Sequence, residues 1–433
     1  YLKVWKLKVS IGAKIIEGPF GGGNAFINNL ANYLKKNNFE IINHLNDKDI
    51  DIILLINPLL GSTTSTFDDL DVLKYINFVN SNTISIQRIN ECDERKNTNY
   101  VNKKIISSNK DIDITIFVSQ WLKELYIEKG LKPKDSYVVR GGPNKNIFNL
   151  RNKQKWETDK KIKIVTHHWS NNWMKGFDTY SKLDSLISEE KWNNKIEFTY
   201  IGNLPKNFTF QNTKVIPPLQ EEELAIELKN HDLYITGSIN EPSGNHHMEA
   251  AMSGLPILFI NSGGIPEYCE GFGEKFELEN LEEKLNLLIE NYEKYFINLQ
   301  NYSYDFENAA KSLIDIFEYG IENKNELINR RRKKSKYQIL FKVINRNTMK
   351  LIYYFYFSSR KRLGALKRLF SWIFMNTKKH IRSIAIPYLS VLFFILTLLF
   401  GRPFMGLNLF GFRVGEYLVG LAFLFSIFLL SNK

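Results

Sequence analysis

Two glutamates, Glu241 and Glu249, have the types and spacing that could do chemistry. Eight positions separate them, with a Pro-Ser-Gly turn and two histidines in between. In one continuous helix, eight residues would subtend about 800°, which leaves the two carboxylates roughly 80° from alignment. A turn followed by a new helix can instead aim both side chains into one cleft. We therefore predict that Glu241 ends a strand and its loop, and that Glu249 lies in the first turn of the next helix.

The helix predicted after Gly244 adds an anion site beside the two glutamates. Its first N–H groups have no partner within the helix, so they point at whatever anion occupies the cleft. An apolar strand over residues 256–260 follows, and a second glycine turn comes after it at Gly263 and Gly264. The sequence thus predicts two carboxylates and a helix start at one ligand site.

The rest of the chain must supply the elements that position this site. Apolar segments of strand length alternate with segments of helical period up to residue 322, which is typical of a doubly wound α/β fold. A polar stretch without periodicity over residues 151–161 predicts a linker between two such series. Strands are expected at residues 3–16, 50–57, 83–89, 114–118, 137–139, 161–166, 196–201, 215–216, 233–236 and 256–260. We predict domains at residues 1–155 and 156–329, with a long helix at 305–322 that packs back on the first domain.

A glycine-rich segment, residues 21–24, follows the first predicted strand and precedes a helix at residues 25–36. Strand, glycine turn and helix start a βαβ unit, and glycine is needed wherever backbone must approach a phosphate or sugar closely. The segment is neither a GxGxxG fingerprint nor a GK[ST] loop, so a tight turn without a ligand is the alternative. Polar side chains that include Arg88 and Arg95 lie at and just after the C-terminal end of the strand at 83–89, where the crevice of an open parallel sheet lies.

Charge is unevenly distributed along the chain. Residues 330–382 hold 17 Lys and Arg with no Asp or Glu, whereas residues 1–329 hold 38 basic and 45 acidic residues. The run at 330–336 is predicted to be solvated. A basic patch confined to one segment favours a surface partner of that segment, and anionic lipid is preferred over nucleic acid because the neighbouring chain is apolar.

The tail at residues 330–433 is predicted to associate with a membrane. Residues 384–400 form an uncharged run of 17 residues, about 26 Å long as a helix, and residues 417–430 form another of 14. An inserted hairpin or two short spans, an interfacial anchor, and a soluble helical subdomain are the alternatives. The basic run beside the first apolar segment predicts a head on the cytoplasmic face of the inner or plasma membrane. Cys92 and Cys269, outside any metal-ligand spacing, fit a reducing compartment.

Five segments together resemble the GT-B glycosyltransferases, specifically the retaining family-4 or group 1 enzymes. They are GPFGGGN at 18–24, VSQWLKELY at 118–126, VVRGGPNKNIF at 138–148, HHWSNNWMKGFD at 167–178 and EPSGNHHMEAAMSGLPILFINSGGIPEY at 241–268. The last segment is the most specific. The resemblance covers roughly residues 3–322, leaves out the tail, and implies two Rossmann-like domains that face a cleft.

The resemblance implies a nucleotide diphosphate sugar as donor substrate, with no cofactor and no metal ion. Two residues are expected to be catalytic: Lys175 as a cationic contact to the diphosphate, and Glu241 as a contact to sugar hydroxyls that stabilises an oxocarbenium-like centre. Glu249 is expected to bind the ribose hydroxyls. The other expected donor contacts are Gly22, Gly23, Gly244, Asn245, Gly263, Gly264 and Arg88.

The chain departs from the family pattern at one cation. Many relatives carry an arginine about five residues before the loop lysine, whereas residues 168–171 are His-Trp-Ser-Asn here. The diphosphate then has one cation fewer, or gains one from Arg88 or Arg140. Lys175 and the helix dipole are expected to do what a divalent ion does in other enzymes.

Together these features predict a retaining hexosyltransferase that uses UDP- or GDP-sugar. Its acceptor is expected to be lipid-linked or a polysaccharide precursor, and nucleic acid is not expected as a partner. Two alternatives are a GT-B-like nucleotide-sugar-binding scaffold without turnover at the membrane and an NDP-sugar epimerase. A Rossmann oxidoreductase is disfavoured because GxGxxG is missing.

Overall fold

The computed structural model describes residues 6–14, 21–59 and 64–331, together with 334–335, 337–339, 342, 408–409 and 412–413. The chain divides into two compact units, Tyr1–Arg346 and Asn347–Lys433, and both large sheets belong to the first. In the second unit, strands β13 (Asn408–Leu409) and β14 (Phe412–Arg413) are described, and they pair antiparallel. The two apolar tail segments predicted to meet a membrane lie outside the described residues.

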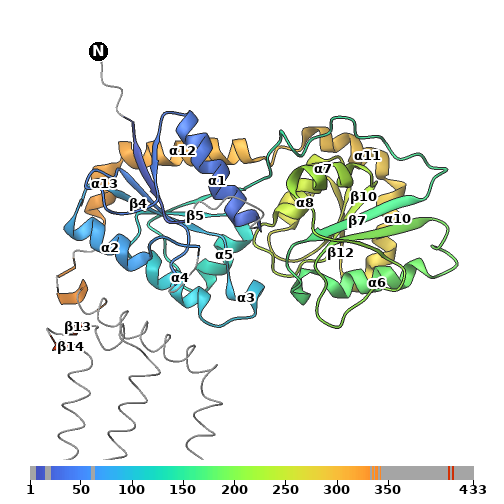
Figure 1. Ribbon diagram of the computed structural model, residues 1–433, viewed down its shortest axis with the longest axis horizontal. Helices are drawn as coiled ribbons and strands as arrows, with labels where there is room; N and C mark the ends of the chain where they lie inside the picture. Colours follow the sequence, from blue (N-terminus) through green and yellow to red (C-terminus); the bar gives the residue numbers. More distant parts are fainter. Residues whose placement is uncertain are drawn as a thin grey trace, which may run out of the picture. The chain divides into compact units, whose positions relative to one another are not determined.

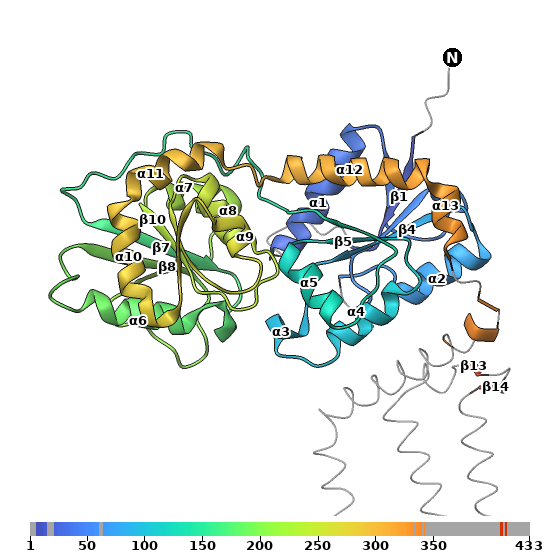
Figure 2. The same ribbon diagram turned by 180° about the vertical axis from the view of Figure 1, so that it is seen from behind.

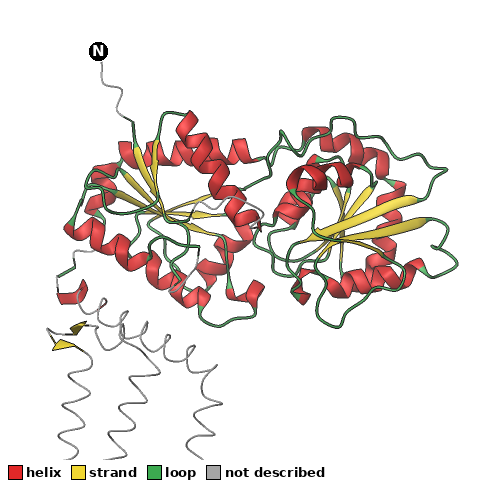
Figure 3. Cartoon of the chain, in the orientation of Figure 1, coloured by secondary structure: helices red, strands yellow, loops and turns green. Residues whose placement is uncertain are grey.

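The first domain is built on a six-stranded parallel sheet with the strand order β2-β1-β3-β4-β5-β6. Figure 3 shows its strands between layers of helix. Its elements are β1 (Lys8–Ile11), α1 (Gly21–Lys36), β2 (Glu40–Ile42), β3 (Ile52–Leu55), α2 (Asp69–Phe78), β4 (Ile84–Ile89), α3 (Asp93–Lys96), α4 (Val101–Asn109), β5 (Ile114–Phe117), α5 (Gln120–Glu128) and β6 (Asp135–Val138).

The second domain repeats this architecture with the parallel order β12-β11-β10-β7-β8-β9. Its elements are β7 (Ile162–His168), α6 (Phe177–Ile187), β8 (Ile196–Gly202), β9 (Lys214–Ile216), α7 (Glu221–Lys229), β10 (Leu233–Thr236), α8 (Asn245–Met252), β11 (Ile257–Ile260), α9 (Pro266–Cys269), β12 (Gly273–Phe276), α10 (Leu281–Glu290) and α11 (Tyr292–Asn298). Helices α12 (Phe306–Glu322) and α13 (Lys324–Asn329) follow it in the chain. Short 3₁₀ turns occupy Trp173–Lys175, Leu278–Asn280 and Leu299–Asn301.

The two sheets confirm the predicted fold class, two doubly wound α/β domains. Strands β3 and β11 read IILL and ILFI, and all four positions of each are buried. Continuous apolar strands of this kind are expected where helices cover both faces of a parallel sheet. In Figure 1, α6 lies on one side of the second sheet and α7 and α8 lie on the other.

Helix α12 follows the second domain in the chain but completes the core of the first. Its residues Phe306, Leu313 and Phe317 share a hydrophobic cluster with Val9 of β1. The rings of Phe306 and Phe26, on α1, meet edge to face with centroids 6.0 Å apart. Both views show α12 running beside α1 (Figure 1, Figure 2). Burial of this helix therefore ties the end of the second domain to the first.

Two local predictions near the N-terminus are wrong. Within the described residues, the first strand covers only Lys8–Ile11, because the chain turns at Ala13, whose N–H donates to the Ile11 carbonyl at 2.7 Å. Residues 21–24 form the first turn of α1 rather than a turn before it. Each glycine in a helix costs about 1 kcal/mol relative to alanine, and the buried side chains of Leu30 and Leu34 later in α1 offset that cost.

The basic run that begins at Arg330 is not solvated at Arg331, where the prediction is wrong. The Arg331 side chain is 13% exposed, and its guanidinium donates to both carboxylate oxygens of Asp113 at 2.9 and 2.6 Å. Asp113 is buried and also accepts from the Ser85 backbone N–H at 2.9 Å. A buried carboxylate needs a close counter-charge, so this arginine docks on the first domain.

Candidate active site

A cavity of about 750 Å³ lies between the two domains, beside the C-terminal ends of strands from both sheets. Open parallel sheets bind their ligands at this edge. Its lining includes seven of the predicted site residues: Gly23, Arg88, Lys175, Glu241, Gly244, Asn245 and Glu249. The structure therefore brings the two glutamates, the loop lysine and the start of α8 into one space.

Lys175 is held in place by the loop that carries it. It ends the 3₁₀ turn Trp173–Lys175, and its carbonyl accepts from Ser238 Oγ at 3.3 Å. Gly176 follows with φ +105°, and a Cβ at that position would come within 2.6 Å of the Gly237 carbonyl carbon. Only glycine fits both this backbone conformation and this close approach. The loop therefore rests on the chain that leaves β10 and leads to Glu241.

Glu241 lies between two cations that come from different domains. Lys175 Nζ donates a hydrogen bond to one carboxylate oxygen. Arg95, on α3 of the first domain, donates from Nε to the other oxygen at 2.9 Å. Arg95 also contacts Glu91, with Nη1 3.2 Å from a carboxylate oxygen. Glu241 itself is only 5% exposed. The three side chains thus form a largely buried ion group that links the two domains.

The charge state of Glu241 follows from this environment. Burial alone would raise the pKa of the carboxyl, because the charged form loses its hydration. The neighbouring Lys175 and Arg95 act in the opposite direction and lower the pKa of Glu241 to about 2. The side chain is therefore ionised at physiological pH, so it can accept hydrogen bonds and stabilise positive charge but has no proton to donate.

The backbone of the Glu241 loop is supported by Gly263 and Gly264. Gly263 has φ +66°, and a Cβ there would lie 2.5 Å from the Glu241 carbonyl oxygen. The Gly264 N–H donates to the same oxygen at 2.9 Å. The two glycines pack behind the loop and are not among the residues that line the cavity. Their position differs from the direct donor contact expected from the sequence.

Glu249 reaches the cavity from α8 (Asn245–Met252), where it is the fifth residue. It therefore lies in the second turn, not in the first as predicted, because the helix begins directly after Gly244. His167 Nε2 is 2.7 Å from a carboxylate oxygen of Glu249, and the Tyr234 hydroxyl is 3.2 Å from His167 Nδ1. This chain of contacts fixes the direction of the Glu249 side chain at the cavity wall.

Comparison with known proteins gives a family match for the second domain. Residues 150–304 match the family described as glycosyl transferases group 1. The second domain therefore matches the group 1 glycosyltransferases. Over 244 residues it is 23% identical to the phosphatidylinositol N-acetylglucosaminyltransferase GPI3 subunit of Saccharomyces cerevisiae, an alignment that covers 50% of this chain and 53% of that protein. The chain thus spans about half the length of the curated relatives it matches.

Solved glycosyltransferase structures share the fold at low sequence identity. HepE of Anabaena, solved in complex with UDP, is 13% identical with a TM-score of 0.53, and the match covers 73% of this chain and all of HepE. Sucrose-phosphate synthase from Thermosynechococcus elongatus is 11% identical with a TM-score of 0.52, covering 72% of this chain and 99% of that one. These likenesses confirm the GT-B arrangement of two Rossmann-like domains.

Three histidines near the cavity, His168, His246 and His247, are neutral hydrogen-bonding groups. Burial lowers the pKa of His168 and His246 well below the usual value, and it lowers that of His247 to about 3. His246 Nε2 lies 2.9 Å from Thr236 Oγ1, and His168 Nε2 lies 2.6 Å from the Tyr180 hydroxyl. Within the described ranges, no group of three or more His, Cys, Asp or Glu side chains is arranged to hold a metal ion.

The two arginines considered as extra cations differ in their surroundings. Arg140 Nη2 donates to Glu267 at 2.8 Å, and Glu267 also accepts from two N–H groups at the start of α5 (Gln120–Glu128). Arg88 lies in the cavity wall, with its guanidinium carbon 4.1 Å from the centroid of the Phe26 ring. Among the residues that the structure describes, no carboxylate pairs with Arg88. It is therefore the arginine available to a ligand.

Sequence reasoning missed two partners of the predicted site, Arg95 and His167. Arg95 meets a glutamate 146 positions away, and His167 meets one 82 positions away. Both lie in segments singled out beforehand, the polar stretch after β4 and the stretch at 167–178. The segments could be found from strand ends and motifs, but their pairing with Glu241 and Glu249 depends on how the domains meet.

Proposed function

We propose that this glycosyltransferase is a retaining hexosyltransferase that takes its sugar from a UDP- or GDP-sugar, without a metal ion. The cavity between the domains has a volume in the range of small-molecule sites, roughly 300–1,000 Å³. HepE, which shares the fold, is solved with UDP. The observation that carries the proposal is the ion group of Lys175, Glu241 and Arg95 in the wall of that cavity.

Each wall of the cavity suits one part of a nucleotide sugar. Lys175 and the N–H groups at the start of α8 supply positive charge for a leaving diphosphate. Glu249, oriented by His167, is an acceptor for the ribose hydroxyls. Glu241 stays ionised, so it can accept hydrogen bonds from the sugar and stabilise the cationic centre as the bond to the diphosphate breaks. Lys175 would then be shared between Glu241 and the diphosphate.

We further propose that the acceptor is a lipid-linked or polysaccharide precursor met at the cytoplasmic face of a membrane. The support is the basic and apolar sequence of residues 330–433 and the name of the GPI3 relative, which specifies a phosphatidylinositol acceptor. In the described part of the chain, no helix is both long enough and apolar enough to cross a bilayer. Fractionation of the full chain with and without high salt would distinguish insertion from electrostatic attachment.

Donor turnover by site variants tests the proposal. Glu241→Gln and Lys175→Ala should each lower the release of nucleotide diphosphate from the preferred nucleotide sugar by about 100-fold or more. Glu270→Gln is the matched control, because this side chain is 64% exposed and lies outside the cavity lining. Near-wild-type turnover in both site variants would overturn the assignment. An inverted anomeric centre in the product would overturn retention, and donor binding without transfer to any acceptor would favour a scaffold.

A further inference from the structure

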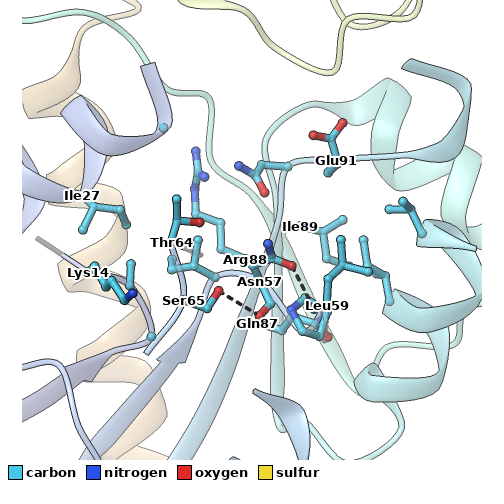
Figure 4. A pocket seen from close by; sticks show the side chains of 18 of the residues that line it. Lys14, Ile27, Asn57, Leu59, Thr64, Ser65, Gln87, Arg88, Ile89 and Glu91 are labelled. Carbon is cyan, nitrogen blue, oxygen red and sulfur yellow. Dashed lines mark hydrogen bonds between the residues drawn. The ribbon is translucent and has the colours of Figure 1, made fainter. Parts of the chain in front are cut away.

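A second, smaller cavity of about 320 Å³ lies in the first domain, at the same C-terminal edge of the sheet (Figure 4). Residues after β1, β3 and β4 line it, together with side chains of α1 and α4. Gly23, Arg88, Asn90 and Glu91 line both this cavity and the larger one. The two spaces therefore adjoin at these four residues, so a ligand in one can meet a ligand in the other.

The charged side chains around the smaller cavity carry a positive excess. Its lining contains three cations, Lys14, Arg88 and Lys96, and one carboxylate, Glu91. Glu91 is already engaged, since Lys96 Nζ lies 2.6 Å from one of its oxygens and Arg95 Nη1 lies 3.2 Å away. Lys14 and Arg88 have no ion pair among the residues that the structure describes. Within the described part of the chain, two cations are thus left for an anionic ligand.

The surroundings of the Arg88 guanidinium favour binding of such an anion. The Phe26 ring covers one face of its guanidinium, and Figure 4 shows the side chain rising beside the cavity between Ile27 and Ile89. Stacking uses the face of a guanidinium and leaves its N–H edge for a carboxylate or phosphate. Burial lowers the pKa of Arg88 to about 10, which reflects poor hydration of its charge. A poorly hydrated cation without a counter-charge gains most from an anionic ligand.

The remaining lining limits what the ligand can be. Ile27, Leu59, Val101 and Ile105 contribute apolar side chains to the lining. A volume near the lower end of the range for small-molecule sites suits one phosphorylated sugar or polyol rather than a whole nucleotide sugar. An acceptor held here would present its hydroxyl group where the two cavities adjoin, which satisfies the proximity that transfer requires.

We propose, on the basis of the glycosyl transfer proposed above, that this cavity binds the acceptor through a phosphate or phosphodiester contacted by Arg88 and Lys14. Arg88 then serves the acceptor rather than the diphosphate of the donor. Two sources could carry the same phosphate chemistry, a lipid headgroup and a soluble sugar phosphate. Both would place the anion at the cations and the carbon skeleton against the apolar side chains of the lining.

Calorimetric titration of the full chain in detergent micelles tests this assignment. The probe is glucose 6-phosphate, glucose is its neutral match, and UDP reports on the donor site. Glucose 6-phosphate should bind at least about tenfold more tightly than glucose, and Arg88→Gln should remove about that factor. Arg88→Lys should restore part of it, because it keeps the charge but loses the fork of donors. Arg151→Gln is the control, since Arg151 is exposed and outside the cavity lining.

Lipids added to the detergent micelles separate the two sources of phosphate. Displacement of glucose 6-phosphate by phosphatidylglycerol in mixed micelles, but not by phosphatidylcholine in mixed micelles, assigns the site to a lipid headgroup. No displacement by either assigns it to a soluble phosphate.

Equal binding of glucose and glucose 6-phosphate would overturn the assignment. Loss of UDP affinity in Arg88→Gln with glucose 6-phosphate binding intact would also overturn it, because Arg88 would then serve the donor. If the protein turns over a nucleotide sugar but binds glucose 6-phosphate no more tightly than glucose, the acceptor site is refuted and the proposed function stands. Arg88-dependent phosphate binding without any turnover refutes the proposed function and leaves the anion site standing.

Discussion

Replacing Glu241 by glutamine removes the charge that balances Lys175 and Arg95 while nearly keeping the side-chain volume. The two cations are only 14% and 28% exposed, so they stay close together without a counter-charge. Breaking a buried ion pair from one side costs about 3–5 kcal/mol. We expect the free energy of unfolding at pH 7 to fall by about 3 kcal/mol, at the lower end of that range, because Arg95 keeps Glu91 as a partner.

The pKa of Glu241 gives an independent magnitude and a pH window. The pKa is about 2 in the folded protein against an ordinary value of 4.5. That difference is worth about 3 kcal/mol of stability at neutral pH. Because the folded pKa is the lower one, this stability is complete well above pH 4.5 and is lost as the pH falls toward 2. At pH 3 about 1.4 kcal/mol remains, so the difference between wild type and Glu241→Gln should shrink by about 2 kcal/mol.

Urea unfolding followed by tryptophan fluorescence at pH 7 and pH 3 measures this change. Trp156, Trp169, Trp173 and Trp192 report on the second domain. At each pH, the free energy of unfolding of Glu241→Gln is subtracted from that of the wild type. This subtraction cancels the contributions of the other titrating groups. Glu270→Gln should leave both values unchanged. A difference that is equal at the two pH values, or below about 1 kcal/mol at pH 7, would refute the electrostatic reasoning, because it would match an exposed ion pair.

Two further predictions concern the supports of the site. His167→Ala should raise the KM for the nucleotide sugar several-fold with a smaller change in kcat, because Glu249 loses the contact that orients it, and steady-state kinetics with an unchanged KM would contradict that role. Gly176→Ala should lower the free energy of unfolding by about 2 kcal/mol or more, through its φ of +105° and its collision with backbone. Gly130→Ala, with φ +88° and open space around it, should cost only about 1 kcal/mol in the same denaturation assay, and equal losses in the two variants would rule out the collision.

The fold was predictable because strands buried on both faces must be apolar along their whole length. Apolar runs such as residues 52–55 and 257–260 indicate such strands even when the neighbouring strands are not known. The glycine-rich start of α1 was not predictable in the same way. Local propensity favours a turn there, and the buried face formed later in the helix overrides it.

The candidate site was likewise predictable from the sequence only in part. Residue type and spacing singled out Glu241 and Glu249, and the family resemblance added Lys175, because a loop, a helix start and a glycine turn are local features of the sequence. Arg95, the partner of Glu241, had no local signal for that role, since 146 positions separate the two. Such a pairing depends on the relative placement of two domains, which is a property of the packed chain.

By itself, the sequence determined the two α/β domains, the family resemblance and the two carboxylates that we expect to face a donor. Only the tertiary structure decided that Glu241 is an ionised counter-charge between two cations and that Arg88 has no carboxylate partner among the described residues. The physical reason is that a charge state and an unpaired donor depend on every group within a few ångströms, and most of these groups come from distant parts of the chain.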